Sequence, residues 1–317
     1  MIREKETKFE RRNIGLDLLK VVCIFAIIVH HLILRSTNLR LIAENSFNMN
    51  DLVFAFINSF LIVAVNCFFL ISGYCGIRGK FSKVLRIVIE TYILFWVVNI
   101  LFVIYEYPIN SELVKSCIFP ISKYWYIFTY VVLSLLAPFI NRLTDNLEEK
   151  EYRRLLLILL CVYSGYSFLI DNNIFGANGG CSLPFAIIVY LIGGYINKFE
   201  ISVKSQTIKI LLYTTLCILC GIGVIVFFKD LNPARAIALS RLGRYTLYVY
   251  IFHSMPVVID FFSNLLINII EGHNALFKLC LILCFASLIM VISLFVGWGT
   301  TLVSSYFQRK LDERRNQ

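Results

Sequence analysis

Four ionisable side chains interrupt an apolar run near the N-terminus that spans residues 14–35 and ends at Arg35. They are Asp17, Lys20, His30 and His31, within the sequence RNIGLDLLKVVCIFAIIVHHLIL. A neutral imidazole near pH 7 accepts a proton from a hydroxyl group, so His31 is a candidate general base, with His30 as the alternative. Ionisable groups are costly within an apolar segment that crosses a bilayer, and there they are functional candidates by default.

A single helix would place two of these groups on one face. Lys20 and His31 are eleven residues apart, which is close to three full helical turns. The helix would separate them by about 16 Å along its axis, and Asp17 would lie one turn before Lys20, where it can pair with it. Two simpler interpretations are that Lys20 extends its ammonium to lipid headgroups and that His31 is a hydrogen-bonded packing residue.

The composition indicates whether such a helix lies in water or in a lipid bilayer. The chain has 317 residues, of which 59% are hydrophobic and 16% charged, and its mean hydropathy is +0.77. A soluble domain has about 25% charged residues. These values exclude a disordered chain, a disulfide-rich secreted fold and an ordinary cytosolic enzyme. They predict an all-α fold, a polytopic bundle of transmembrane helices without a soluble domain.

Nine clear apolar segments are near the ~20 residues needed to cross ~30 Å of hydrocarbon. They are 14–35, 52–73, 84–105, 124–141, 154–172, 183–197, 208–228, 245–265 and 275–305. The sixth is short, and the ninth is long enough to continue past the bilayer as an interfacial helix.

Basic residues between these segments predict the topology, because Lys and Arg concentrate on the cytoplasmic side. The N-terminus and the loops 75–86 and 198–209 are rich in Lys and Arg, and the mixed-charge loop 142–154 also carries several, which places all four inside. The alternation fails at 208–244, so we expect a broken, re-entrant or additional short span there and a cytoplasmic C-terminus. The net charge of +10 is therefore assigned to topology and anionic lipids and not to nucleic acid.

Several other polar residues lie within the apolar segments. Gly73 allows close helix packing or a break in the helix, Arg86 and Glu90 are spaced for an ion pair, and Trp125 suits an interfacial aromatic belt. Each has a structural interpretation, packing or interface, beside a role in the site. The weaker candidates for binding substrate or acyl-CoA are Asp17, His30, Asn66, Ser72, Arg86, Trp125, Tyr130, Tyr250 and His253.

The ten cysteines show no paired or metal-ligand spacing. Cys217 and Cys220 form a C-x-x-C, but they lie in an apolar segment without a preceding strand. We therefore predict neither a redox site nor a metal site.

The first helix resembles the signature of acyltransferase family 3, in which an Arg and a His are separated by ten residues. Here Lys20 and His31 have that spacing. Three more blocks agree in order, NCFFLISGY (66–74), YWYIFTY with APFIN (124–141) and YTLYVYIFH (245–253), and LIGGYI (191–196) is a weaker fifth. Lysine keeps the charge of the signature arginine but lacks its bidentate fork.

The resemblance implies one integral-membrane domain over 1–317, in the cell membrane, with about ten helices. It implies transfer of an acyl group, usually acetyl, from acyl-CoA to a hydroxyl of a polysaccharide or a lipid-linked glycan, with no permanently bound cofactor. His31 would be the catalytic histidine, acting as a base or as an acyl carrier, and Lys20 would take the place of the signature arginine.

Two other functions compete with this one. A transporter or flippase of a lipid-linked sugar can use an intramembrane His/Lys/Asp relay, but transporters often contain internal repeats, and none is visible here. A non-catalytic scaffold or sensor would leave the polar face of the first helix unexplained. The resemblance favours the enzyme.

Overall fold

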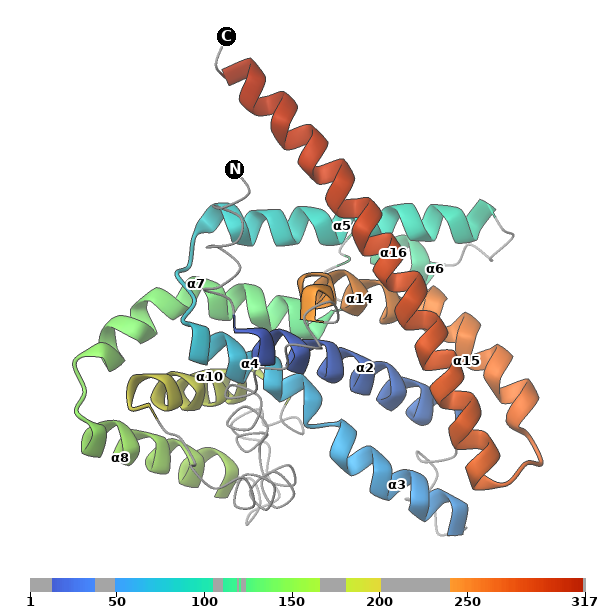
Figure 1. Cartoon of the computed structure of the whole chain (residues 1–317), viewed down its shortest axis with the longest axis horizontal. Helices are drawn as coiled ribbons and strands as arrows, with labels where there is room; N and C mark the ends of the chain where they lie inside the picture. The colour runs from blue at the N-terminus through green and yellow to red at the C-terminus, as the bar shows by residue number, and fades with distance from the viewer. Residues whose placement is uncertain are drawn as a thin grey trace. The chain divides into compact units, whose positions relative to one another are not determined.

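The computed structural model describes residues 13–37, 49–104, 111–118, 120, 124–165, 181–200 and 240–315. Every regular element in these residues is helical, which confirms the all-α class for this part of the chain (Figure 1). Five helices are long and apolar enough to cross a membrane, and a bent pair raises the number to six if it is counted as one span. The chain is therefore a multi-pass membrane protein.

Most predicted segments correspond to helices in the described residues. These are α2 (Ile14–Ser36), α5 (Phe81–Ile104), α7 (Trp125–Asp145), α10 (Leu183–Lys198) and α16 (Ala275–Arg315). The segment predicted at 52–73 consists of two helices, α3 (Met49–Leu61) and α4 (Ala64–Cys75), although residues 51–75 still count as one span. The segment at 208–228 lies outside the described residues, as does most of the region where the predicted topology fails.

The apolar segment predicted at 245–265 is broken in the structure. It consists of α14 (Thr246–His253) and α15 (Pro256–Ile270), which are bent by 69° relative to each other. Pro256 causes the break because it has no N–H to donate to the preceding turn. It also disfavours a helical conformation for the residue before it, and Met255 is extended, with φ −61° and ψ 131°. The break leaves His253 as the last residue of α14.

The chain divides into two compact units, which we describe separately. In the described residues, unit 1 contains the start of α2, α4, the start of α5, α7, α8 (Glu149–Leu160) and α10. Helices α4 and α10 lie side by side (Figure 1). A Cβ atom on Gly73 would lie 1.9 Å from the carbonyl oxygen of Tyr190, and one on Gly193 would lie 2.1 Å from that of Leu70. The two backbones are therefore in direct contact, which confirms the predicted close packing at Gly73.

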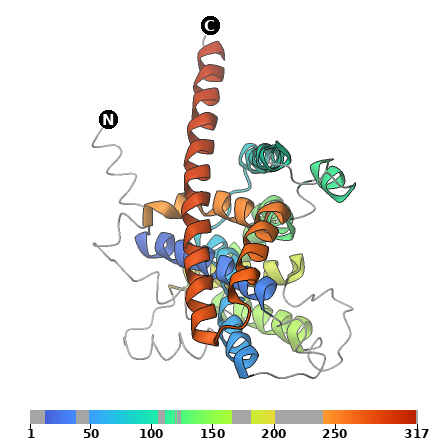
Figure 2. The ribbon, with the colours of Figure 1, turned by 90° about the vertical axis from the view of Figure 1, so that its right-hand side faces the viewer.

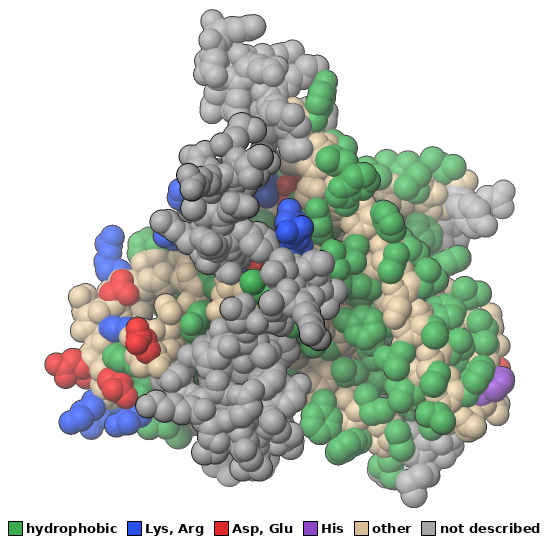
Figure 3. Space-filling view, viewed as in Figure 1, with side chains coloured by type: hydrophobic (Ala, Val, Ile, Leu, Met, Phe, Trp, Pro, Cys, Tyr) green, Lys and Arg blue, Asp and Glu red, His purple; other side chains and the backbone are tan. Residues whose placement is uncertain are grey.

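The segment predicted to begin at 154 begins earlier, as the charged helix α8. The helix begins at Glu149 within a capping box, in which the side chains of Glu148 and Glu151 each accept a hydrogen bond from the other's backbone N–H. Lys, Arg, Asp and Glu side chains gather over α8 and the end of α7 (Figure 3). A short π-helix, Cys161–Gly165, follows.

Unit 2 contains the remainder of α2 and α5, together with α3, α6 (Ser111–Ile118), α14, α15 and α16. Helices α14 and α15 pack against α16, which continues to Arg315 as one long helix (Figure 2). Large apolar side chains on α5 and α16, such as Ile100, Leu101, Ile104 and Phe295, are each more than half exposed. Such apolar surfaces suit contact with lipid and would be unfavourable in water.

Candidate active site

Three histidines meet within unit 2. His30 and His31 lie near the C-terminal end of α2, and His253 ends α14. The ring centroids of His31 and His253 are 5.2 Å apart, and those of His30 and His31 are 5.5 Å apart. The ring of His31 is therefore in contact with both other imidazoles. We call these three residues the histidine cluster.

His253 is completely buried, and its hydrogen bonds fix its tautomer. Its Nδ1 atom lies 2.7 Å from the carbonyl oxygen of Val249, one turn earlier in α14. A carbonyl can only accept a hydrogen bond, so Nδ1 carries the proton and the neutral ring has a lone pair on Nε2. Nε2 has no hydrogen-bond partner in the described part of the chain. A buried polar atom without a partner is costly and calls for a functional explanation.

His30 is oriented in a similar way by α3. Its Nδ1 atom lies 2.6 Å from Oδ1 of Asn58. Because an amide oxygen accepts, His30 donates from Nδ1, and its Nε2 is an acceptor in the neutral state. Two imidazoles with basic Nε2 atoms thus flank His31.

The cluster can take up a proton and return it. A proton removed from a hydroxyl by His31 would produce a cation next to two neutral rings. Tyr250, which is buried, presents its ring edge-on to His253, with centroids 5.7 Å apart. The cluster can therefore act in general acid–base catalysis on an alcohol.

The second group of predicted residues lies in unit 1. Lys20 forms the predicted ion pair with Asp17, at 3.0 Å between Nζ and Oδ1. Asp17 is buried and Lys20 is partly exposed. Oδ1 of Asn13 accepts a hydrogen bond from the N–H of Leu16 at 3.0 Å, which caps the start of α2. The carboxylate of Asp17 also lies in the first turn, where the helix dipole stabilises a negative charge.

A model of the acyltransferase domain family matches residues 13–229, more than half of the chain. The chain belongs to acyltransferase family 3. No curated protein and no solved structure matches it. The match includes Asp17, Lys20, His30 and His31 but ends before His253, so α14 joins the site of this acyltransferase on geometric grounds.

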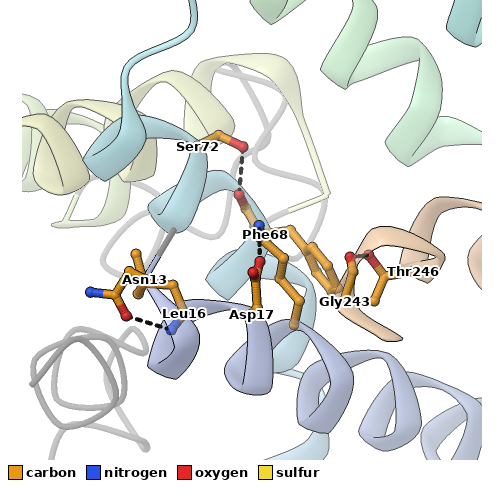
Figure 4. Close-up of polar contacts among 8 residues, drawn as sticks. Asn13, Leu16, Asp17, Phe68, Ser72, Gly243 and Thr246 are labelled. Atoms are coloured by element: carbon orange, nitrogen blue, oxygen red, sulfur yellow. Dashed lines mark hydrogen bonds and ion pairs between the residues drawn. The ribbon is translucent and has the colours of Figure 1, made fainter. Parts of the chain in front are cut away.

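The remaining predicted residues of the acyltransferase occupy both units. In unit 1, Tyr130 on α7 is within hydrogen-bonding reach of Ser72 on α4, and the Ser72 hydroxyl donates to the carbonyl of Phe68 (Figure 4). Asn66 and Trp125 are partly exposed at the first turns of α4 and α7. Arg86 is exposed on α5.

Glu90, the predicted partner of Arg86, is buried in unit 2. Its carboxylate accepts hydrogen bonds from Tyr248 at 3.0 Å and from Ser304 at 3.4 Å. The pairing with Arg86 stays a prediction.

The sequence did not predict two side chains that contact residues in or next to the histidine cluster. Asn58 orients His30, and Asp260 on α15 pairs with Arg35, four residues after His31. A signal existed for both, because an amide at 58 and a carboxylate at 260 are polar groups within apolar segments.

Proposed function

We propose that this acyltransferase moves an acetyl group from acetyl-CoA, or another acyl group from its CoA thioester, to a hydroxyl of a bacterial surface polysaccharide or its lipid-linked precursor. The observation that carries the proposal is the contact between His31 and the buried, tautomer-fixed imidazole of His253. This contact supports His31, the histidine of the family signature, as the base. Family membership supports the acyl transfer itself.

In the direct route, the acyl group passes from the thioester to the acceptor hydroxyl in one transfer. His31 removes the proton of the acceptor hydroxyl, and the oxygen attacks the carbonyl carbon of the thioester. The C–O bond forms, the C–S bond breaks, and the proton held by His31 passes to the departing CoA thiolate. In the covalent route, a ring nitrogen of His31 attacks the thioester carbonyl, the C–S bond breaks, and the CoA thiolate leaves with the proton of the other ring nitrogen. The acceptor oxygen then attacks the acyl-imidazole, the C–N bond breaks, and the hydroxyl proton passes to the released imidazole.

Lys20 has a different role, because it lies on the same helix but about 16 Å from His31 along the axis, or three turns. We assign it to the attraction of the anionic phosphates of CoA, together with basic residues of the 75–86 loop. Its ion pair with Asp17 holds the ammonium at a defined position.

We further propose that both termini are cytoplasmic. Contacts within unit 1 support the predicted sidedness of two loops and the end of α10. The amide of Asn141 donates to the carbonyl of Ile77, which joins the 75–86 loop to the end of α7. The ammonium of Lys198, at the end of α10, donates to the carbonyls of Thr144 and Leu147 in the 142–154 loop. The end of α10 and the described parts of two loops predicted on the same side of the membrane are therefore adjacent.

Analysis of surface glycans tests the proposal. Cells that lack the protein should lose one acyl substituent by mass spectrometry and NMR, and the native chain should restore it. His31→Ala should fail to restore it while inserting normally into the membrane. Val22→Ala is the matched control, because Val22 lies on the same helix with an exposed side chain. Acylation by His31→Ala at the native level would refute the assignment, and accumulation of untranslocated glycan with unchanged acylation would favour the flippase.

A further inference from the structure

An open cleft of about 480 Å³ lies within unit 1, where the turn after α4 meets the last turns of α7. One wall is the turn at Gly76, Ile77 and Arg78. The other consists of α7 residues, among them Asn141 and Arg142. The proposed function gives the basic residues of the 75–86 loop, which include Arg78, a general attraction for CoA but assigns no binding site in this cleft.

A closed set of hydrogen bonds makes the cleft rigid. The hydroxyl of Tyr190 accepts from the N–H of Ile77 at 3.1 Å and donates to Oδ1 of Asn141 at 2.8 Å. Nδ2 of Asn141 donates to the carbonyl of Ile77 at 3.0 Å. These groups satisfy one another, so the wall is built before any ligand arrives.

Two glycines bring the turn onto α7. Gly76 and Gly79 have φ of +67° and +58°, which favour glycine. A Cβ atom on Gly79 would lie 2.3 Å from Cγ of Pro138. The turn is therefore pressed against α7 at the proline and holds the backbone of Arg78 at the cleft.

The cleft has two cationic groups available for a ligand. Arg78 and Arg142 are both exposed, and neither guanidinium is paired with an acidic group in the described ranges. Lys198 differs, because its ammonium is occupied by the carbonyls of Thr144, Asp145 and Leu147 at the end of α7. Asp145 adds one carboxylate to the lining, so two cations face one anion.

The Asp17–Lys20 pair belongs to the same compact unit as this cleft. The family-signature cation and the two arginines of the cleft are therefore both part of unit 1.

We propose that this cleft is a phosphate-binding site in which Arg78 and Arg142 hold the phosphates of the CoA moiety. The proposal rests on the acyl-CoA donor put forward above. A guanidinium presents parallel N–H groups that match two phosphate oxygens. Phosphate of an anionic lipid headgroup offers the same chemistry, so the experiment distinguishes the two sources.

Binding of CoA to the full chain in phosphatidylcholine nanodiscs tests the proposal. Arg78→Gln and Arg142→Gln should each weaken CoA binding about tenfold, because each removes a charge-assisted contact. Arg142→Lys should fall between, since it keeps the charge but loses the fork. Arg153→Gln, on the exposed side of α8, is the control and should bind CoA normally. Native CoA affinity in the Arg78→Gln/Arg142→Gln double variant would overturn the proposal.

A measurement on the native protein avoids any folding defect of the variants. Cys75 is exposed at the cleft, so bound CoA should slow its alkylation by a maleimide, resolved by peptide mass spectrometry. The exposed Cys161 of the same unit should react at an unchanged rate. Equal alkylation of Cys75 with and without CoA would contradict the proposal.

Two further comparisons are needed. One distinguishes lipid phosphate from CoA phosphate in the cleft, and the other distinguishes failure of the cleft assignment from failure of the proposed CoA donor. Protection of Cys75 by phosphatidylglycerol in the nanodisc, but not by CoA, would assign the cleft to lipid and overturn its role for the donor. If the native protein acylates its glycan but binds no CoA, the proposed donor fails. If CoA binding persists in His31→Ala but is also unchanged in the arginine variants, only the cleft assignment fails.

Discussion

The imidazole rings of His31 and His253 lie with their centroids 5.2 Å apart and their planes 30° from parallel. His253 presents an acceptor on Nε2, because its Nδ1 proton is held by the carbonyl of Val249. The pair therefore joins a partly exposed imidazole to a buried one whose orientation is fixed.

Replacement of His253 tests whether this neighbour matters for catalysis. His253→Gln should lower kcat about tenfold or more while KM for acyl-CoA stays unchanged, because His253 acts through His31. His31→Ala should cost more, about 10²–10⁴ in rate. Steady-state acyl transfer in nanodiscs measures both. A change in KM alone would show that His253 contributes to binding and not to positioning.

Asn58→Leu tests the orientation of His30. The substitution leaves Nδ1 of His30 without its acceptor, which should cost about 1 kcal/mol of stability. If His30 supports His31, acyl transfer should fall as well. Thermal unfolding and activity measured on the same sample separate the two effects. Ser59→Leu, at an exposed position of the same helix, is a suitable control, and an equal loss in that variant would remove the special role of Asn58.

A set of variants can distinguish two roles of Lys20, the attraction of phosphate and the neutralisation of Asp17. Lys20→Arg should preserve or raise activity, because it keeps the charge and adds a fork for phosphate. Lys20→Met should raise KM for acyl-CoA and should also destabilise the protein, since it removes the cationic partner of a buried carboxylate, Asp17.

The Asp17→Asn/Lys20→Met double variant should recover the stability but not the KM. The KM for acyl-CoA and the thermal stability of the single and double variants, measured on the same preparations, check this prediction. A double variant with native KM would show that Lys20 serves only to neutralise Asp17.

Gly193→Ala should disrupt the contact of α4 with α10. The new methyl group would lie 2.1 Å from the carbonyl oxygen of Leu70, and overpacking of this kind costs about 2 kcal/mol. Gly299→Ala is the matched control, because a Cβ atom there has no described neighbour within 4 Å. Thermal unfolding in detergent should separate them, and equal stability of the two variants would refute the close contact.

Tyr152 provides a prediction of pH dependence outside the membrane spans. Burial raises the pKa of its hydroxyl from 10.0 to about 12, and the hydroxyl donates to the carbonyl of Leu191. Because the folded pKa is the higher one, this stabilisation is complete below pH 10 and is lost as the pH rises towards 12. Tyr152→Phe should be less stable at pH 8, and its deficit should shrink between pH 10 and 12. A deficit independent of pH would contradict the assignment.

Local features of the site followed from the sequence. The Asp17–Lys20 pair was predictable because residues three apart on a helix are neighbours, and the shared helix of Lys20 and His31 followed from an uninterrupted apolar run. The break after His253 carried a signal in Pro256 that a hydropathy reading passes over.

Long-range contacts could not be predicted in the same way. The bond between His30 and Asn58 joins residues 28 apart, and the contact between His31 and His253 joins α2 to α14. Periodicity shows which face of a helix is polar but not which partner meets it. Gly73 was expected to pack closely, yet only the structure identified Tyr190 as the residue it meets.

The length of α16 has a consequence for the membrane around the protein. Its apolar part, Ala275–Ser304, has 30 residues. At 1.5 Å per residue this part is about 45 Å long, while the hydrocarbon layer is about 30 Å thick. Such a hydrophobic mismatch is relieved by tilting of the helix or by local thickening of the bilayer. The enzyme should therefore respond to the chain length of its lipids, with α16 more upright in thick bilayers than in thin ones.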